Sequence, residues 1–534
     1  MSREPVDVAA LLGEVGTSAP VSELARRRWD AIVVGGGHNG LTAAAYLARA
    51  GRSVLVLERR ERLGGACTLE RPFGEAPEFV VSPCAYVVGL LDDVVIRELE
   101  LERHGYKVFP ADPNLFCPLP GGSSFAEFID PRRTAEHLRA QGFAEGDIAG
   151  LKAYDDAFDR LRRALRRGPG GDTWLAPSPS RAEVERIVRD PELISILFED
   201  SIAEVLDRYI GDPRLKDALF GQGVIGTFAG PRDPGTASIH LMHGQGDLQG
   251  LGPVWGYVEG GMGRVSFAIA QAALEAGAEL AAGVEVASIA PGEGVATVDG
   301  EFIPAGAVIV NADPKRTLGM LAEAAVPAEF RERLEGWVLA SPVVKLNAAL
   351  SRPPTFPAAG EVDAYRAMVS ITPGLDAAQE AVERARGGEP AFGFAELYFQ
   401  TAYDPSVAPA GKHVMSVFAQ YAPYELAHGT WDERRAEIRD LILDGIELHA
   451  PDVRECIEHL EVLGPPDIEQ RIGLSGGHIF QGEALPFQMW DRRLRWRTPV
   501  EGLYMCGAAT HPGGSVIALN GRGAAGAVLA DLGD

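Results

Sequence analysis

Three glycines and one acidic residue near the start of the chain could bind the phosphates and a ribose of a dinucleotide. Gly35, Gly37 and Gly40 form a G-x-G-x-x-G motif, and Glu58 follows farther along. The first glycine permits a tight turn, the second lets a pyrophosphate approach the backbone, and the third lets a helix pack closely on a strand. A helix N-terminus offers N–H groups to phosphate, and a carboxylate accepts hydrogen bonds from an adenosine ribose. The alternative is a glycine-rich turn in an ordinary βαβ unit.

The hydrophobic pattern predicts the elements that would position this motif. Residues 31–34 and 53–57 are short apolar runs of the kind that form buried strands. Residues 41–49 predict a helix, and Gly51 stands where a glycine in the left-handed conformation would end it. The order strand, helix, strand, with Glu58 at the end of the second strand, predicts the opening of a Rossmann-like α/β domain.

A second glycine pair distinguishes this segment from a nicotinamide-binding unit, which has no need of it. Gly64 and Gly65 follow Glu58 and Arg59, and Ala66 comes next. The stretch resembles the E-[KR]-x-x-x-x-G-G sequence of the phytoene desaturase and flavin-containing amine oxidase superfamily, which lies against FAD. Within that superfamily, the sequence GGGHNGL is most similar to the pyridine nucleotide-disulphide oxidoreductase domain-containing proteins.

The C-terminal region carries a second part of the same resemblance. Residues 502–514 resemble GLYxxGAxTHPGG, the closing motif of the phytoene desaturases. We predict a helix over 516–532, whose positive end would face the N1/C2=O edge of a flavin. The resemblance implies FAD, bound non-covalently in our expectation. It assigns the following residues to the cofactor: Gly35, Gly37, His38, Asn39, Gly40, Glu58, Arg59, Gly64, Gly65, Ala66, Val286, Gly507, Ala508, Gly514, Ser515 and Val516.

The middle of the chain holds another glycine cluster, residues 258–264. The resemblance implies that the chain returns here to the FAD domain, so that the backbone at Val286 meets the adenine. The alternative is an independent NAD(P) site. Gly261 and Gly263 are followed by Ser266 in place of a third glycine, and no acid ends a clean strand after them. We therefore expect no built-in NAD(P) site.

The predicted fold class is α/β, with a Rossmann-like FAD-binding domain of the GR2 type interleaved with an α+β substrate domain. Alternating patterns predict an antiparallel sheet in the substrate domain, and a helical insertion precedes it. In the FAD domain, residues 302–303 and 307–310 read as two strands. The predicted boundaries are an N-terminal extension at 1–28 with a short helix at 7–12, an FAD domain at 29–110, 255–330 and 461–534, and a substrate domain at 111–254 and 331–460.

Two histidines are the candidate catalytic residues. His511 lies in the closing motif, so the resemblance places it near the flavin; a structural hydrogen bond is the alternative. His478 lies about where the monoamine oxidase branch carries its flavin-linking cysteine, so it could face the isoalloxazine or carry a covalent link. His240 and His243 have no third ligand in sequence, and we predict no metal site.

Composition excludes several classes of function. The 534 residues carry a formal net charge of −25, which argues against binding to nucleic acid or to an anionic membrane surface. The five cysteines contain no CxxC pair, so a dithiol redox centre is not expected. There is no secretory signal and no apolar run near the roughly 18 residues of a membrane span. We expect a cytoplasmic protein with no transmembrane segment, and a homodimer is compatible with the sequence.

The predicted function follows from the implied cofactor. We expect an FAD-dependent oxidoreductase that moves a hydride from a hydrophobic or amphipathic small molecule to flavin N5. Oxygen, a quinone or another carrier would then serve as the external electron acceptor. Two alternatives remain open: a redox-silent isomerase that keeps FAD for structure, and a flavin-bound protein that regulates a partner.

Overall fold

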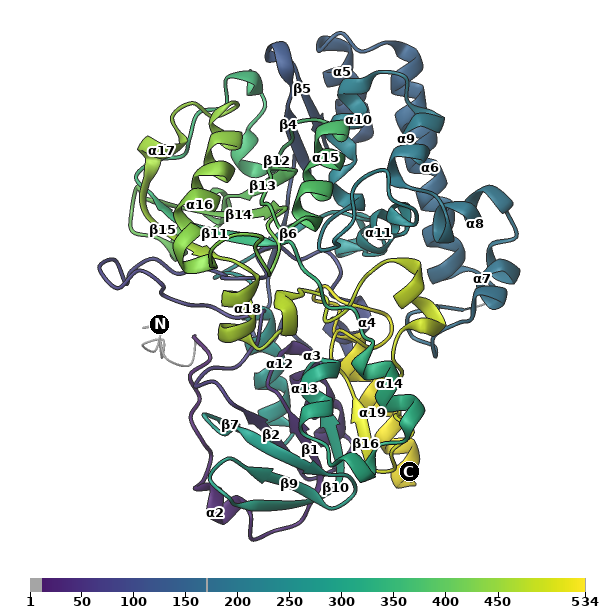
Figure 1. Ribbon diagram of the computed structural model, residues 1–534, viewed down its shortest axis with the longest axis vertical. Coiled ribbons are helices and arrows are strands. Elements are labelled where there is room, and N and C mark those ends of the chain that lie inside the picture. Colours follow the sequence, from purple (N-terminus) through teal and green to yellow (C-terminus); the bar gives the residue numbers. More distant parts are fainter. Residues whose placement is uncertain (1–11, 170, 534) are drawn as a thin grey trace.

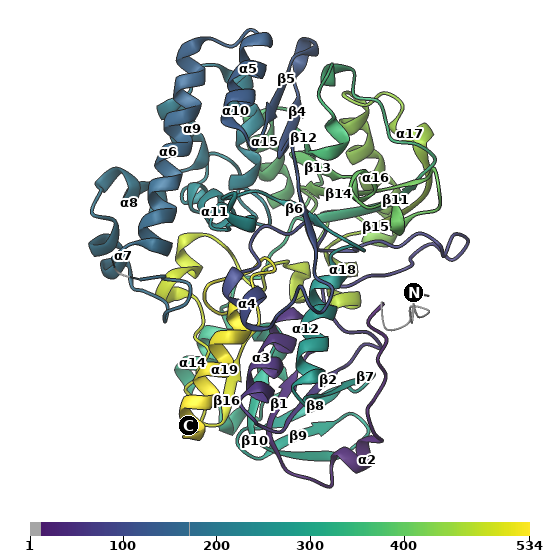
Figure 2. The ribbon, with the colours of Figure 1, turned by 180° about the vertical axis from the view of Figure 1, so that it is seen from behind.

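Two seven-stranded sheets organise the chain, and each carries its own set of helices (Figure 1). The computed structural model describes residues 12–169 and 171–533. The first sheet lies in the lower half of Figure 1 and the second in the upper half, and Figure 2 shows the same division from behind. The helix predicted at 7–12 lies outside the described residues except for Leu12. No helix in the described part of the chain combines the length and apolarity that a membrane crossing requires.

The first sheet has the strand order β7-β2-β1-β10-β9-β8, with β16 paired to β10. Strands β7, β2, β1, β10 and β16 are parallel, and β8, β9 and the start of β10 form an antiparallel meander. Its strands are β1 (Trp29–Val34), β2 (Val54–Glu58), β7 (Glu279–Ala282), β8 (Val286–Ala290), β9 (Gly294–Thr297), β10 (Phe302–Val310) and β16 (Leu503–Met505).

Strand β10 corrects the prediction of two strands at 302–303 and 307–310. It is continuous but changes partners: Pro304 pairs with β9, and from Ala305 onward the strand pairs with β1. Each partner strand covers only part of β10. The hydrophobic pattern of the sequence is therefore interrupted at the change of partner, although the hydrogen bonding of the strand continues. The central position of β10 places the residue after it, Asn311, beside the end of β1.

Three helices pack on one face of this sheet: α3 (His38–Arg49), α12 (Gly263–Glu275) and α19 (Leu519–Leu532). Figure 1 shows the two ends of the chain meeting there, the purple α3 beside the yellow α19. A Cβ on Gly521 would lie 2.1 Å from the carbonyl oxygen of Asn39, so only glycine permits this approach. The helix predicted from residue 516 starts at Leu519, because Ser515 and Ala518 adopt positive φ angles of 71° and 67° that interrupt a helix.

The second sheet has the order β15-β11-β14-β13-β12-β4-β5 and is antiparallel except for the pair β12 and β4. Its strands are β4 (Leu115–Pro118), β5 (Ser124–Glu127), β11 (Val344–Leu350), β12 (Met368–Ile371), β13 (Phe394–Tyr398), β14 (His413–Gln420) and β15 (Ile457–Leu463). The predicted boundary at residue 461 falls within β15. The other domain boundaries stay predictions.

The helices that follow β5 pack together beside the second sheet (Figure 1). They are α5 (Pro131–Ala140), α6 (Glu145–Arg167), α7 (Arg181–Val188), α8 (Pro191–Phe198), α9 (Ile202–Tyr209), α10 (Pro213–Leu219) and α11 (Thr236–His243). The stretch 181–219 forms four separate helices, α7 to α10, with one break at residues 210–212. It also breaks before α8 and α9, because Asp190 and Ser201 cap those helices with their side chains.

The remaining elements lie outside the two large sheets. Strands β3 (Val108–Pro110) and β6 (Gly256–Val258) form a short ribbon. The helices are α2 (Val21–Leu24), α4 (Asp93–Glu98), α13 (Pro314–Gly319), α14 (Ala328–Glu335), α15 (Leu375–Arg386), α16 (Trp431–Glu447), α17 (Val453–Cys456) and α18 (Pro465–Ile472).

Candidate functional site

A cavity of about 340 Å³ opens at the carboxyl ends of β1, β2 and β10. Ligands of open α/β sheets bind at this edge, outside the ends of the strands. We call it the nucleotide cavity. It is lined by Val34, Gly35, Gly37, His38, Asn39, Leu57, Glu58, Arg59, Gly64, Gly65, Ala66, Val284, Glu285, Val286, Asn311, Ala312, Arg316, Met320, Ile472, Gly473, Leu474, Ile479, Gln481 and Ala508.

The glycine motif forms one wall of this cavity. Gly37 is the N-cap of α3, and no side chain caps the helix, so its first N–H groups are available to an anion. Gly65 packs against Gly37, where an added Cβ would lie 3.3 Å from the Gly37 Cα. Gly40 does not line the cavity: its Cβ would lie 2.2 Å from the Gly35 carbonyl oxygen, so its role is the close packing of helix on strand.

Glu58 forms the acidic end of the cavity. Its Oε2 accepts a hydrogen bond from the Gly36 N–H at 2.7 Å, and its Oε1 accepts one from the Arg60 N–H at 2.9 Å. Burial raises the pKa of this carboxyl, while the two backbone bonds favour its charged form. The carboxylate is therefore fixed in place at the cavity wall. An uncapped helix, glycines with no room for a side chain and a fixed acid together fit an adenine dinucleotide.

Replacing Glu58 with alanine is expected to weaken FAD binding by about 10- to 150-fold, because hydrogen bonds to a charged group contribute roughly 1.5–3 kcal/mol. Titration of the apoprotein with FAD, followed by flavin fluorescence, measures the change. Glu61→Ala is the matched control, because Glu61 is exposed and does not line the cavity. Equal affinities of Glu58→Ala and Glu61→Ala would show that Glu58 does not contact the nucleotide.

A second cavity of about 130 Å³ adjoins the first, and we call it the chamber. His38, Ala66, Leu474, Ile479 and Ala508 line both spaces. Most of the chamber wall is apolar. Its apolar lining residues include Val87, Ile225, Trp255, Val343, Met368, Phe418, Phe480 and Val516.

Two oppositely charged residues interrupt this apolar wall, Lys345 on β11 and Glu396 on β13, each 1% exposed. Lys345 Nζ donates to Ser416 Oγ at 2.5 Å and lies 3.8 Å from the centre of the Tyr86 ring. Glu396 Oε1 accepts from Gln222 Nε2 at 2.8 Å. Its other oxygen, Oε2, accepts from the Tyr398 hydroxyl.

Burial brings the pKa values of Lys345 and Glu396 close together. It lowers the pKa of Lys345 to about 7 and raises the pKa of Glu396 to about 7. The amine and the carboxyl can therefore gain or lose a proton near neutral pH, as a general acid or base requires. Sequence reasoning missed both residues. The available signal was a charged residue inside each of two strands, VKLNAAL and FAELY, that are otherwise almost wholly apolar.

The residues assigned to the cofactor divide into three groups. Lining the nucleotide cavity are Gly35, Gly37, His38, Asn39, Glu58, Arg59, Gly64, Gly65, Ala66, Val286 and Ala508. Ser515 and Val516 line the chamber. Gly40, Gly507 and Gly514 lie behind the walls, where a Cβ on Gly507 would meet Gln481 Oε1 at 2.3 Å and one on Gly514 would meet the Phe480 side chain at 2.5 Å. The two ends of the sequence thus share one site.

Neither candidate catalytic histidine lines the nucleotide cavity or the chamber. His511 Nε2 lies 2.7 Å from the Thr173 carbonyl oxygen, which is the structural hydrogen bond of the alternative interpretation. His478 is fully buried, and its Nδ1 accepts from the Phe480 N–H at 3.3 Å. Burial lowers the pKa of His511 to about 4 and that of His478 to about 3, so both are neutral at pH 7. Both side chains therefore lie outside the two cavity walls, and Nε2 of His478 is buried without a hydrogen-bond partner among the described residues.

The other two histidines lie on α11. His243 lines the chamber, with Nδ1 3.0 Å from the Gln222 carbonyl oxygen, whereas His240 packs against the ring of Phe158. Across residues 12–169 and 171–533, no group of three or more His, Cys, Asp or Glu side chains is arranged to hold a metal ion.

A buried arginine fixes the closing motif to the segment that separates the two cavities. The guanidinium of Arg493 donates to the carbonyl oxygens of Phe480 at 2.7 Å, Glu483 at 2.9 Å and Ala508 at 2.6 Å. Gln481, another lining residue that the sequence did not reveal, donates to the Asn311 carbonyl oxygen at 3.1 Å. These bonds hold Ala508 where the nucleotide cavity and the chamber meet.

Comparison with known proteins finds relatives that match most of the chain. The sequence profile of the family described as flavin containing amine oxidoreductase matches residues 40–529. The chain is 33% identical over 548 residues to pyridine nucleotide-disulfide oxidoreductase domain-containing protein 2 of Mus musculus, covering 94% of each chain. It is 27% identical to the hydroxyneurosporene desaturase of Rhodobacter capsulatus, covering 95% of this chain and 99% of the desaturase.

The fold is also found among solved structures. The cyclohexylamine oxidase of Brevibacterium oxydans superposes with a TM-score of 0.56 at 16% identity, covering 95% of this chain and 100% of the oxidase. At this identity the likeness concerns the fold alone. The profile match and the mouse relative show membership: the chain is an FAD-dependent oxidoreductase of the flavin containing amine oxidoreductase family, in the branch of the pyridine nucleotide-disulfide oxidoreductase domain-containing proteins.

Proposed function

We propose that the protein is a dehydrogenase or desaturase that takes a hydride from a hydrophobic or amphipathic small molecule. The observation that carries the proposal is the chamber, an apolar space next to the nucleotide cavity with Lys345 and Glu396 in its wall. FAD, when bound, supplies the two-electron acceptor at N5. The similarity to a hydroxyneurosporene desaturase supports a substrate of this class. An external acceptor, such as oxygen or a quinone, belongs to the same proposal.

Removal of a hydride from one substrate atom must be accompanied by loss of a proton from its neighbour as the new double bond forms. The neutral amine of Lys345 accepts that proton, and the negative charge of Glu396 favours the protonated amine that results. Gln222 and Tyr398 fix Glu396 through their hydrogen bonds. The apolar wall excludes water, so the proton stays on the amine until the product leaves.

Anaerobic mixing of the holoprotein with fractions of a total lipid extract tests the proposal. At least one fraction is expected to bleach the flavin absorbance. Because Lys345 carries a proton below about pH 7 and loses it above, the rate of bleaching is expected to rise through pH 7 and then level off. A flavin that no fraction and no other donor reduces would contradict the proposal and favour a redox-silent isomerase or a regulatory protein.

A further inference from the structure

A row of three polar side chains crosses the second sheet next to the chamber. Asn347 on β11 lies opposite Ser416 on β14 and opposite Glu461 on β15. Asn347 is 1% exposed, and its side chain has a partner for each polar group. Its Oδ1 accepts from Ser416 Oγ at 3.4 Å, and its Nδ2 donates to Glu461 Oε2 at 3.1 Å and to the Pro83 carbonyl oxygen at 3.3 Å.

The row ends on the chamber lysine. Lys345 precedes Asn347 by two positions on β11, so both side chains lie on the same face of the sheet. The Ser416 hydroxyl accepts a hydrogen bond from Lys345 Nζ at 2.5 Å and donates one to Asn347 Oδ1. Since Pro83 lies just before the chamber residues Cys84 and Tyr86, Asn347 also ties this wall of the chamber to the sheet.

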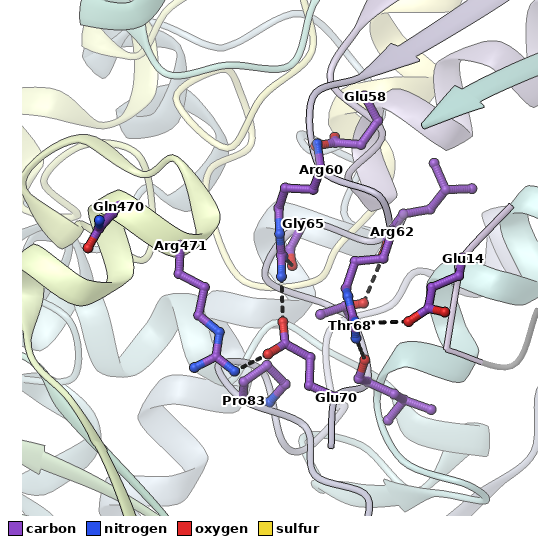
Figure 3. Close-up of polar contacts among 12 residues, drawn as sticks. Glu14, Glu58, Arg60, Arg62, Gly65, Thr68, Glu70, Pro83, Gln470 and Arg471 are labelled. Carbon is purple, nitrogen blue, oxygen red and sulfur yellow. Dashed lines mark hydrogen bonds and ion pairs between the residues drawn. The ribbon is translucent and has the colours of Figure 1, made fainter. Parts of the chain in front are cut away.

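Alternating charges continue the row from Glu461 to Glu58 in the wall of the nucleotide cavity. Arg471 on α18 donates to Glu461 Oε1 at 2.5 Å and also pairs with Glu70. Figure 3 shows Glu70 between Arg471 and Arg60. The distance from Glu70 Oε1 to the Arg60 guanidinium is 2.5 Å. The backbone N–H of Arg60 in turn holds Glu58. The side chain of Glu70 is only 7% exposed, so solvent screens these charges weakly.

We propose that Ser416, Asn347 and Glu461 are positioning residues for Lys345, and that the ion pairs behind Glu461 govern whether the amine carries a proton. The inference deepens the proposed function and rests on it, since it gives the proton acceptor its orientation and charge state. Each acid in this set of ion pairs has a basic partner. Removal of one basic or one acidic group therefore leaves an uncompensated charge on the same row as Lys345.

Two substitutions leave uncompensated charges of opposite sign, one negative and one positive. Arg471→Gln leaves the Glu461 carboxylate without its partner, which favours the protonated amine of Lys345. Glu461→Gln leaves the Arg471 guanidinium without that partner, which favours the neutral amine. The other titratable groups in the chamber wall are unchanged in both variants; they are His38, Cys67, Cys84, Tyr86, His243, Glu396 and Tyr398.

The titration of Lys345 can be followed directly, because the chain has only six lysines. The holoprotein is prepared with ¹³Cε-labelled lysine, and the Lys345 signal is assigned as the one that Lys345→Met removes. The titration midpoint is expected to rise in Arg471→Gln and to fall in Glu461→Gln, each by roughly half a unit or more. Arg132→Gln, whose side chain is 85% exposed, is the charge-matched control and is expected to leave the midpoint unchanged.

Midpoints that stay within error of wild type, or that move in the same direction in both variants, would overturn the inference. A loosened structure cannot produce shifts of opposite sign, and retained FAD verifies that each variant is folded. Positioning is tested by rescue: Ser416→Ala is expected to slow flavin bleaching and Ser416→Thr to restore it. The titration requires no substrate, so the two hypotheses can fail separately. If the Lys345 midpoints shift in opposite directions but no donor reduces the flavin, the proposed function alone is rejected. If the flavin is bleached but the midpoints do not shift, the charge coupling alone is rejected.

Discussion

Replacing Lys345 with methionine is expected to slow reduction of the flavin by about 10²- to 10⁴-fold, the contribution typical of a positioned acid or base. Methionine keeps the length and apolar volume of the side chain but has no amine. Lys345 lies in the chamber and not in the nucleotide cavity, so the variant should still bind FAD. Stopped-flow mixing with the lipid fraction that bleaches the wild-type protein measures the rate, and the rise through pH 7 should disappear.

The control for this substitution is Lys152→Met, because the side chain of Lys152 is 75% exposed on α6. The flavin of the Lys152→Met variant should be reduced at the wild-type rate and with the wild-type pH profile. A Lys345→Met variant that also behaves as wild type would show that another group accepts the proton, and Glu396 would be the next candidate.

The same substitution should stabilise the folded protein. Burial lowers the pKa of Lys345 from 10.5 in the unfolded chain to about 7, so the unfolded state binds the proton more tightly. Burial of Lys345 therefore lowers the stability of the wild-type protein by its full amount below about pH 7, and this loss disappears as the pH rises to 10.5. A gain in stability for Lys345→Met that is larger at pH 7 than at pH 10 would agree with this sign.

Replacing Arg493 with methionine is expected to lower the free energy of unfolding by about 3–5 kcal/mol, as for other buried charges that lose a partner. The guanidinium is 0% exposed and donates to the carbonyl groups of residues 480, 482, 483 and 508. Methionine would leave those carbonyl groups buried without donors, and each such group costs about 1–3 kcal/mol. Urea unfolding of the holoprotein, followed by circular dichroism, gives the change.

The neighbouring residue supplies the matched control. Arg492 is exposed, so Arg492→Met should change the free energy of unfolding by no more than about 0.5 kcal/mol. The Arg493 variant should also release FAD more readily, because Ala508 loses its anchor. Equal stabilities of the two variants would show that the closing motif is held by other contacts.

The nucleotide half of the site could be predicted from sequence because its determinants are local. The turn around Gly35 and Gly37, the helix after it and the acid that ends β2 are set by residues within one βαβ unit. The closing motif could be found for the same reason. The left-handed residues Ser515 and Ala518 could not be predicted, since neither is a glycine, and they delay the last helix to Leu519.

The chamber could not be predicted, because its polar groups come together only through strand pairing. Lys345, Glu396 and Ser416 lie on three different strands, and no local spacing links them. The histidines were chosen for their chemistry and their place in the resemblance. In the structure, His511 bonds to the Thr173 carbonyl oxygen and His478 is completely buried, so neither side chain lines the nucleotide cavity or the chamber.

The flavin content of the purified protein tests most directly whether one FAD is held by both ends of the chain. The wild-type protein is expected to carry one FAD per chain. Gly37→Val at one end and Ala508→Phe at the other should each abolish binding by filling the nucleotide cavity, while circular dichroism shows both variants folded. A colourless wild-type protein that takes up no FAD on reconstitution would contradict the account, and so would full FAD content in either variant.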